Sequence, residues 1–172
     1  MPLSLQNRQR SVHLNTAKLG RDVRCLMTYL GCEQQELSIV FSNDQFMQKL
    51  NRTYRQKDYA TNVLAFPQDT SEFEHQDNSL LGDIVIAVPT AAREAHALEQ
   101  SIEDRLFYLI IHGLLHLLGY DHERSTEDRL AMEAREAEVL KHFKRELSLE
   151  NAADHSVHQN VHPSKLQASN NA

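Results

Sequence analysis

The sequence has no apolar run long enough to cross a membrane, and it has very few cysteines. Across its 172 residues, no stretch approaches the roughly 18 consecutive apolar residues that a transmembrane helix needs. The first residues lack a basic segment followed by an apolar one, so we expect no secretory signal. The two cysteines, Cys25 and Cys32, are too few for a disulfide framework and predict reduced thiols. These absences argue against a membrane-spanning protein and a disulfide-stapled one, and they indicate a cytoplasmic location.

The charge of the chain is acidic on average but unevenly distributed. The length, a hydrophobic content of 41% and a charged content of 24% are typical of one globular domain. The formal net charge of −6 by itself argues against binding to nucleic acid. Residues 1–57 nevertheless hold nine basic and four acidic residues, a net charge of +5, which leaves −11 for residues 58–172. This separation can build a phosphate-binding surface on an acidic protein, although solvated helix faces explain it equally well.

Three histidines in the segment Ile111-His-Gly-Leu-Leu-His-Leu-Leu-Gly-Tyr-Asp-His122 are the strongest functional signal in the sequence. On a helix, positions four apart lie on one face, so the imidazoles of His112 and His116 can converge. Gly119 can adopt the left-handed conformation that ends a helix, and His122 then follows as a third ligand. Three neutral imidazoles with one open position form the usual catalytic zinc site. The spacing therefore predicts one zinc ion per chain, held by these three side chains.

Ordinary burial explains these histidines less well than a metal does. A single histidine on an apolar helix face is usually a satisfied core residue. Here the surrounding segment is strongly apolar, and burying His112 and His116 there without partners would cost about a few kcal/mol. A shared metal ion removes that cost.

The segment differs from the zinc-protease pattern at one informative position. Proteases of the metzincin kind read H-E-x-x-H-x-x-G-x-x-H, with the glutamate as general base. This chain has the histidine and glycine spacing, but Gly113 stands at the glutamate position. We therefore expect a metzincin-like three-histidine site on a helix that lacks the base for peptide hydrolysis.

The hydrophobic periodicity predicts helices that alternate with a few strands. Alternating apolar residues predict strands at 3–13, 36–41, 62–66 and 80–88. Asn15 and Ser101 are candidate helix caps, and Ser42 begins a capping box with Gln45. Helical spacing predicts helices at 15–30, 90–99 and 126–147, with two more opened by Ser42 and Ser101. The expected fold is an α/β (α+β) domain with one small sheet.

The C-terminal residues differ in composition from the rest of the chain. From Ser148 onward the sequence is rich in Asn, Ser, Gln and Ala and shows no periodicity. We therefore expect one domain at residues 1–147 and a disordered tail at residues 148–172.

Together with the histidine segment, several other blocks resemble the YbeY family of bacterial endoribonucleases. Met132 and Glu136 fit that family's closing helix. Three further blocks match in order and spacing: Leu50-Asn51-x-x-Tyr54-Arg55-x-x-Asp58, Thr61-Asn62-Val63-Leu64-Ala65-Phe66-Pro67 and Leu81-Gly82-Asp83-Ile84. The resemblance covers roughly residues 3–147. Two positions differ, since Asn62 stands where many members have Asp, and Ala65 where Ser is common.

This resemblance implies a fold, an activity and a set of partners. It implies a mixed sheet flanked by helices, with a zinc ion in a cleft. It implies a zinc-dependent cut in single-stranded RNA rather than DNA, in maturation of the 3′ end of 16S ribosomal RNA and in ribosome quality control. The expected partners are ribosomal RNA and the small ribosomal subunit in the cytoplasm, with no membrane.

Two further residues are candidates for catalysis. A guanidinium can engage two phosphate oxygens at once, and Arg55 is our candidate for stabilising the negative phosphorane because it lies in a block shared with the family. An exposed arginine at a helix end is the alternative. Asp121 and Glu123 flank His122, and either can orient an imidazole or accept a proton, unless both are plain loop charges. The sequence does not decide whether the 2′-hydroxyl of RNA or a water molecule is the nucleophile.

Two other classes of function remain open at this point. One is a non-catalytic ribosome-assembly factor in which zinc only stabilises a binding surface. The other is a metal-dependent hydrolase or peptidase, against which Gly113 already argues.

Overall fold

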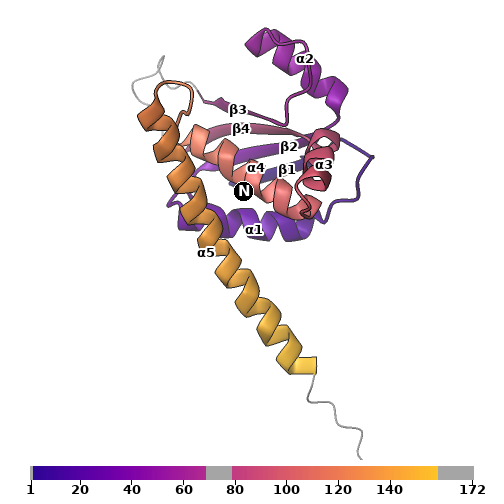
Figure 1. The fold of residues 1–172 in the computed structure, drawn as a ribbon, viewed down its shortest axis with the longest axis vertical. Coiled ribbons are helices and arrows are strands. Elements are labelled where there is room, and N and C mark those ends of the chain that lie inside the picture. The colour runs from indigo at the N-terminus through magenta and orange to yellow at the C-terminus, as the bar shows by residue number, and fades with distance from the viewer. Residues whose placement is uncertain (1, 69–78, 159–172) are drawn as a thin grey trace, which may run out of the picture. The chain divides into compact units, whose positions relative to one another are not determined.

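A four-stranded mixed sheet lies at the centre of the N-terminal part of the structure (Figure 1). The structure is a computed structural model that describes residues 2–68 and 79–158, with side chains up to Lys144. The strands are β1 (Leu3–Asn7), β2 (Glu36–Ser42), β3 (Val63–Pro67) and β4 (Leu80–Ala87), and their spatial order is β1, β2, β4, β3. β1, β2 and β4 are parallel to one another, and β3 pairs with β4 in the antiparallel direction. β3 is therefore an edge strand of this sheet.

Helices pack on both faces of this sheet. The helices in the described part of the chain are α1 (Thr16–Tyr29), α2 (Asp44–Arg55), α3 (Val88–Ala97), α4 (Ile102–Leu117) and α5 (Thr126–His158), and of these α1 to α4 contact strands of the sheet. Neighbouring residues of a strand point to opposite faces, so β4 shows which helix covers which face. Ile84 lies against Gly113 of α4, whereas Val85 packs in a cluster with Met47 of α2. The expected α/β fold, with a mixed sheet flanked by helices, is confirmed.

The chain divides into two compact units, Met1–Glu136 and Ala137–Ala172. The sheet and the residues of the site described below all belong to the first unit. In the second unit, the rings of His142 and Phe143 contact each other edge to face at 5.2 Å. None of the helices in the described part of the chain has the length and apolar content needed to cross a bilayer.

Two of the three expected helix caps are confirmed and one is wrong. The side chain of Asn15 accepts a hydrogen bond from Lys18 N at 3.0 Å, and Ser101 accepts one from Asp104 N at 3.1 Å. At the start of α2, however, the cap is Asn43, which accepts from Phe46 N at 2.8 Å. Ser42 is still part of β2, where its hydroxyl donates to the carbonyl of Ile86 at 3.1 Å. A buried strand hydrogen bond thus outcompetes the local cap that the sequence predicted.

Two expected boundaries also differ from the structure. The first strand ends at Asn7 rather than near residue 13, because the buried Gln9 side chain bonds both the N–H and the carbonyl of Val12, at 2.9 and 2.8 Å, and closes a turn. The last helix continues to His158, past the expected end at residue 147. Residues 159–172 lie outside the described residues, so the division into 1–147 and 148–172 stays a prediction.

Candidate metal centre

The three histidines expected to bind a metal come together in the structure. His112 and His116 lie one turn apart on α4, and Gly119, with a φ of +99°, reverses the chain just after the helix. Its N–H donates to the carbonyl of His116 at 3.0 Å, which closes the helix end and brings His122 back toward it. One ligand nitrogen from each ring lies within 4.8 Å of the others. The sequence spacing thus correctly predicted a cluster that can hold a metal ion.

The surroundings of His116 suit the binding of a metal ion. Burial lowers the pKa of His116, and the neighbouring His112 and His122 rings lower it further. A lowered pKa keeps the imidazole neutral near pH 7, with a lone pair available for coordination. Nδ1 of His122 is buried and has no hydrogen-bond partner among the described residues. Three nitrogen donors of this kind fit a zinc ion, or another divalent ion with a preference for imidazole.

A buried carboxylate orients the first histidine. Nδ1 of His112 lies 2.5 Å from Oε1 of Glu136 on α5, and Nε2 of His112 lies 3.2 Å from Nε2 of His116. Glu136 is only 7% exposed, and its other oxygen accepts a hydrogen bond from the Tyr108 hydroxyl at 3.3 Å. Metal-binding histidines commonly donate their second N–H to such a carboxylate. Our sequence reasoning looked for this partner in Asp121 and Glu123 and missed Glu136. The available signal was its position four residues after Met132, which places it on the buried face of α5.

Gly113 allows α4 to lie close against the sheet. A Cβ atom at this position would lie 3.1 Å from two side-chain carbons of Ile84 on β4, closer than most real Cβ contacts. Ile84 is fully buried, so it has little space to move. The position that holds the glutamate in zinc proteases is therefore a glycine here, and this glycine permits a close contact between α4 and β4.

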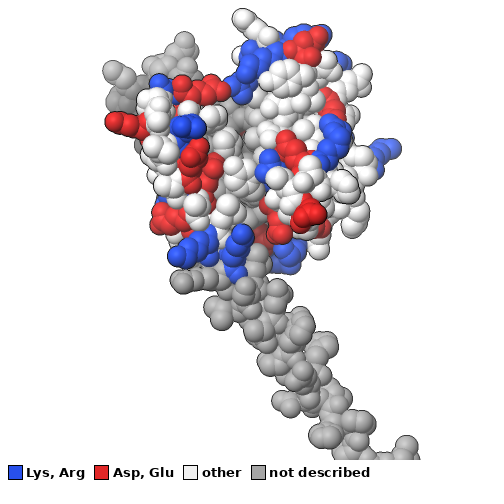
Figure 2. Space-filling model, in the orientation of Figure 1, with Lys and Arg blue, Asp and Glu red and all other residues white. Residues whose placement is uncertain are grey.

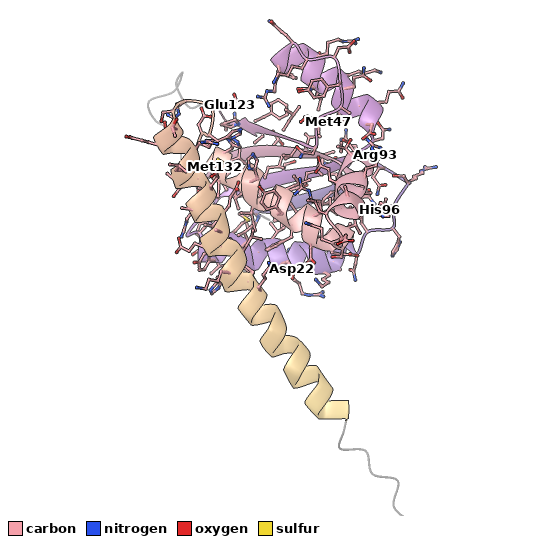
Figure 3. All side chains as sticks on the ribbon, viewed as in Figure 1. Asp22, Met47, Arg93, His96, Glu123 and Met132 are labelled. Carbon is pink, nitrogen blue, oxygen red and sulfur yellow. The ribbon has the colours of Figure 1, made fainter. Side chains whose placement is uncertain are left out.

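Arg55 and Asp121 both lie next to the histidine cluster. Arg55 ends α2, and its Nη2 donates to Oε1 of Glu123 at 2.7 Å. Figure 3 shows Glu123 in the connection between α4 and α5. Asp121 accepts a hydrogen bond from Glu123 N at 2.9 Å and lies 3.3 Å from Nε of Arg124. The backbone hydrogen bond is the main cause that lowers the pKa of Asp121, and Arg124 adds to it. No hydrogen bond from Asp121 or Glu123 to an imidazole is found among the described side chains.

All five expected site residues line one cleft of about 690 Å³. One wall is the end of α2, with Tyr54 and Arg55. The floor is β3 and the residues before it, 61–67, and the other wall is α4 with the loop 119–124. Figure 2 shows Lys and Arg side chains over α2, interspersed with acidic ones. The basic residues of α2 are Lys49, Arg52 and Arg55, and of these Arg55 lines the cleft.

Comparisons with known proteins agree with these features. The family model described as Endoribonuclease YbeY matches residues 4–144. A protein of Geobacter metallireducens called Endoribonuclease YbeY is 40% identical over 147 residues, which cover 85% of this chain and 98% of that protein. A protein of the same name from Syntrophus aciditrophicus is 37% identical over 141 residues, which cover 81% of this chain and 88% of the relative.

A solved structure supports the fold alone. The solution structure of a Thermotoga maritima protein aligns over 95% of this chain and 99% of its own, with a TM-score of 0.54 and 20% sequence identity. At this identity the likeness concerns the arrangement of helices and strands and carries no conclusion about activity.

Proposed function

The chain belongs to the endoribonuclease YbeY family, and we propose that it is an RNA-cleaving hydrolase that cuts single-stranded RNA with a zinc ion held by His112, His116 and His122. Its substrate is ribosomal RNA of the small subunit, in maturation of the 3′ end of 16S RNA and in ribosome quality control in the cytoplasm. The observation that carries the proposal is the convergence of three imidazole nitrogens in a cleft that an arginine also lines.

Each residue of the cleft has a distinct part in this proposal. The three histidines would hold the zinc ion, which when bound supplies Lewis-acid stabilisation of negative charge on phosphate oxygens. Glu136 keeps the second nitrogen of His112 turned away from the ion. Arg55 forms a hydrogen bond with Glu123 in this structure. When RNA binds, its guanidinium leaves Glu123 and donates two N–H groups to the phosphorane.

Asp121 has a positioning role rather than that of a general base. One of its oxygens accepts the N–H of Glu123 and the other lies 3.3 Å from Nε of Arg124, so both oxygens already have partners within the loop. It therefore holds the loop in which His122 lies. A peptidase role is not supported, because Gly113 provides no general base and its contact with Ile84 leaves little space for one.

Wild type and His116→Ala, measured in parallel, test the proposal. Metal content is determined by elemental analysis, and cleavage is followed under single-turnover conditions on an unstructured RNA and on its DNA counterpart. We expect about one zinc per wild-type chain and cleavage of the RNA only, with metal and cleavage lost together in His116→Ala. Wild-type protein that carries its zinc but cuts no RNA, alone or with small ribosomal subunits, would instead identify a non-catalytic assembly factor.

A further inference from the structure

Tyr54 is a large aromatic side chain that lies in the wall of the cleft and yet is 65% exposed. Its ring centroid lies 5.0 Å from that of Phe66 at an interplanar angle of 67°, an edge-to-face pair. Tyr54 comes from α2 and Phe66 from β3, so two separate elements fix this pair. An exposed aromatic residue contributes little to folding, because most of its surface stays in water.

The support under Tyr54 is rigid. Phe66 packs against the buried cluster formed by Met47, Leu64, Val85 and Ala87. The last turn of α2 is closed by Gln56, whose left-handed backbone places its N–H on the carbonyl of Arg52 at 3.2 Å. Tyr54 is therefore held in place from below while much of its ring surface remains open.

Arg55, the residue next to Tyr54, indicates which kind of ligand can bind on the tyrosine ring. Arg55 follows Tyr54 directly and lines the same cleft. In single-stranded RNA each phosphate is followed by a base that is free to leave its stack, and proteins bind such bases on exposed aromatic rings beside basic groups. An aromatic ring next to an arginine in the cleft thus matches the alternation of base and phosphate along one RNA strand.

We propose that Tyr54, supported by Phe66, is a stacking site for one base of single-stranded RNA, next to the phosphate held by Arg55. This inference rests on the proposed function, because it names how the same cleft binds its substrate. Stacking on a tyrosine ring does not depend on which base is present, so the site fixes the position of the strand rather than its sequence.

The chain offers a matched control in Tyr59. It is 54% exposed and lies close to Tyr54 in the sequence, but it is not among the residues that line the cleft. Its backbone carbonyl accepts a hydrogen bond from Asn51 at 2.8 Å, which a side-chain substitution leaves in place. Phe46, 38% exposed on α2, also lies outside the cleft and serves as a second control.

The first test measures binding of a short unstructured RNA by fluorescence anisotropy, in a His116→Ala background so that the RNA stays intact. Tyr54→Ala should weaken binding by about 5- to 150-fold, the range for loss of one stacked base. Tyr54→Phe should bind within about twofold of the parent, and Tyr59→Ala should be unchanged. The salt dependence of binding should keep its slope in Tyr54→Ala, because no phosphate contact is removed.

The second test uses the absence of tryptophan from this sequence. Tyr54→Trp introduces a single tryptophan, whose fluorescence RNA should quench on stacking, whereas Tyr59→Trp should show no quenching. Unchanged binding in Tyr54→Ala together with no quenching in Tyr54→Trp would overturn the inference while leaving RNA cleavage intact. The inference would also be overturned if Tyr54→Ala bound RNA normally and weakened only the binding of a ribosomal protein. Loss of RNA binding and cleavage in wild-type protein would instead refute the proposed function itself.

Discussion

Nδ1 of His112 lies 2.5 Å from Oε1 of Glu136, so a carboxylate on α5 holds a histidine on α4. The contact leaves Nε2 of His112 facing His116, at 3.2 Å. The tautomer of the imidazole is thereby set, because the nitrogen next to the carboxylate carries the proton. The geometry of the histidine cluster thus depends on a residue that lies outside it.

Removal of this carboxylate should weaken metal binding. Glu136→Ala should lower metal affinity by about 10- to 100-fold, and Glu136→Gln by less, because its amide oxygen can still accept the imidazole N–H. Tyr108→Phe removes only the longer, 3.3 Å hydrogen bond to Glu136 and should have the smallest effect. Competition with a chelator of known affinity measures all three variants. Unchanged affinity in Glu136→Ala would show that His112 keeps its orientation without this partner.

The clustering of the three histidines could be predicted from the sequence, but the residues that support the cluster could not. Helical periodicity and one glycine are local properties of the sequence. They were enough to predict that His112, His116 and His122 lie together in the structure. The role of Glu136 depends on how α5 meets α4, and the role of Gly113 depends on its contact with Ile84 of another element. Such contacts arise from the packing of elements that lie far apart in the sequence, so a local sequence pattern cannot predict them.

The same distinction explains which parts of the fold were misjudged. The expected strand up to residue 13 ended early because Gln9 folds back onto Val12. Ser42 was expected to cap a helix, but β2 continues through it and its hydroxyl bonds Ile86 across the sheet. In both cases a polar side chain has two competing sets of partners, and the packing of neighbouring strands decides between them.

Arg55→Ala should reduce cleavage without loss of metal. If Arg55 stabilises the phosphorane, the single-turnover rate at saturating protein should fall by about 100- to 1000-fold. Arg52→Ala is the matched control, since Arg52 lies on the same helix and is exposed but does not line the cleft. A loss of affinity with a normal rate, together with a shallower salt dependence, would assign Arg55 to binding of the phosphate backbone instead.

The two cysteines should differ in their reactivity toward thiol reagents and in how they affect the free energy of unfolding at high pH. Cys25 is exposed and Cys32 is buried. Burial, helped by Glu33, raises the pKa of Cys32 from 9.0 to about 11, so at pH 8 only about one molecule in a thousand carries the thiolate. A thiol reagent should label Cys25 rapidly and Cys32 only on unfolding, as mass spectrometry can establish.

The raised pKa of Cys32 should also make the stability of the protein depend on pH. Because the folded state favours the protonated thiol, the contribution of Cys32 to the free energy of unfolding is present below about pH 9. That contribution should be lost as the pH rises toward 11, and Cys32→Ala should lack this part of the decline.

Asn62, Glu94 and Arg105 form a small hydrogen-bonded network in which the amide of Asn62 has a defined part. The amide of Asn62 donates to both oxygens of Glu94, at 3.1 and 3.3 Å, and Arg105 donates to the same carboxylate at 2.7 and 2.9 Å. The oxygen of the Asn62 side chain accepts from Val63 N at 2.7 Å. An aspartate at position 62 would place a second carboxylate against Glu94.

Asn62→Asp should therefore destabilise this protein, by about 1–3 kcal/mol in the free energy of unfolding, because a hydrogen-bond donor is replaced by a like charge. Adding Glu94→Gln should recover part of that loss, since the new amide can donate to the new carboxylate, with a coupling of about 0.5–3 kcal/mol. Denaturant unfolding of the two single variants and the double variant measures this coupling. The deficit of Asn62→Asp should also shrink toward pH 4, where the introduced carboxyl group is protonated and again donates to Glu94. Additive effects, with no dependence on pH, would show that Arg105 alone neutralises Glu94 and that the amide at position 62 is not required.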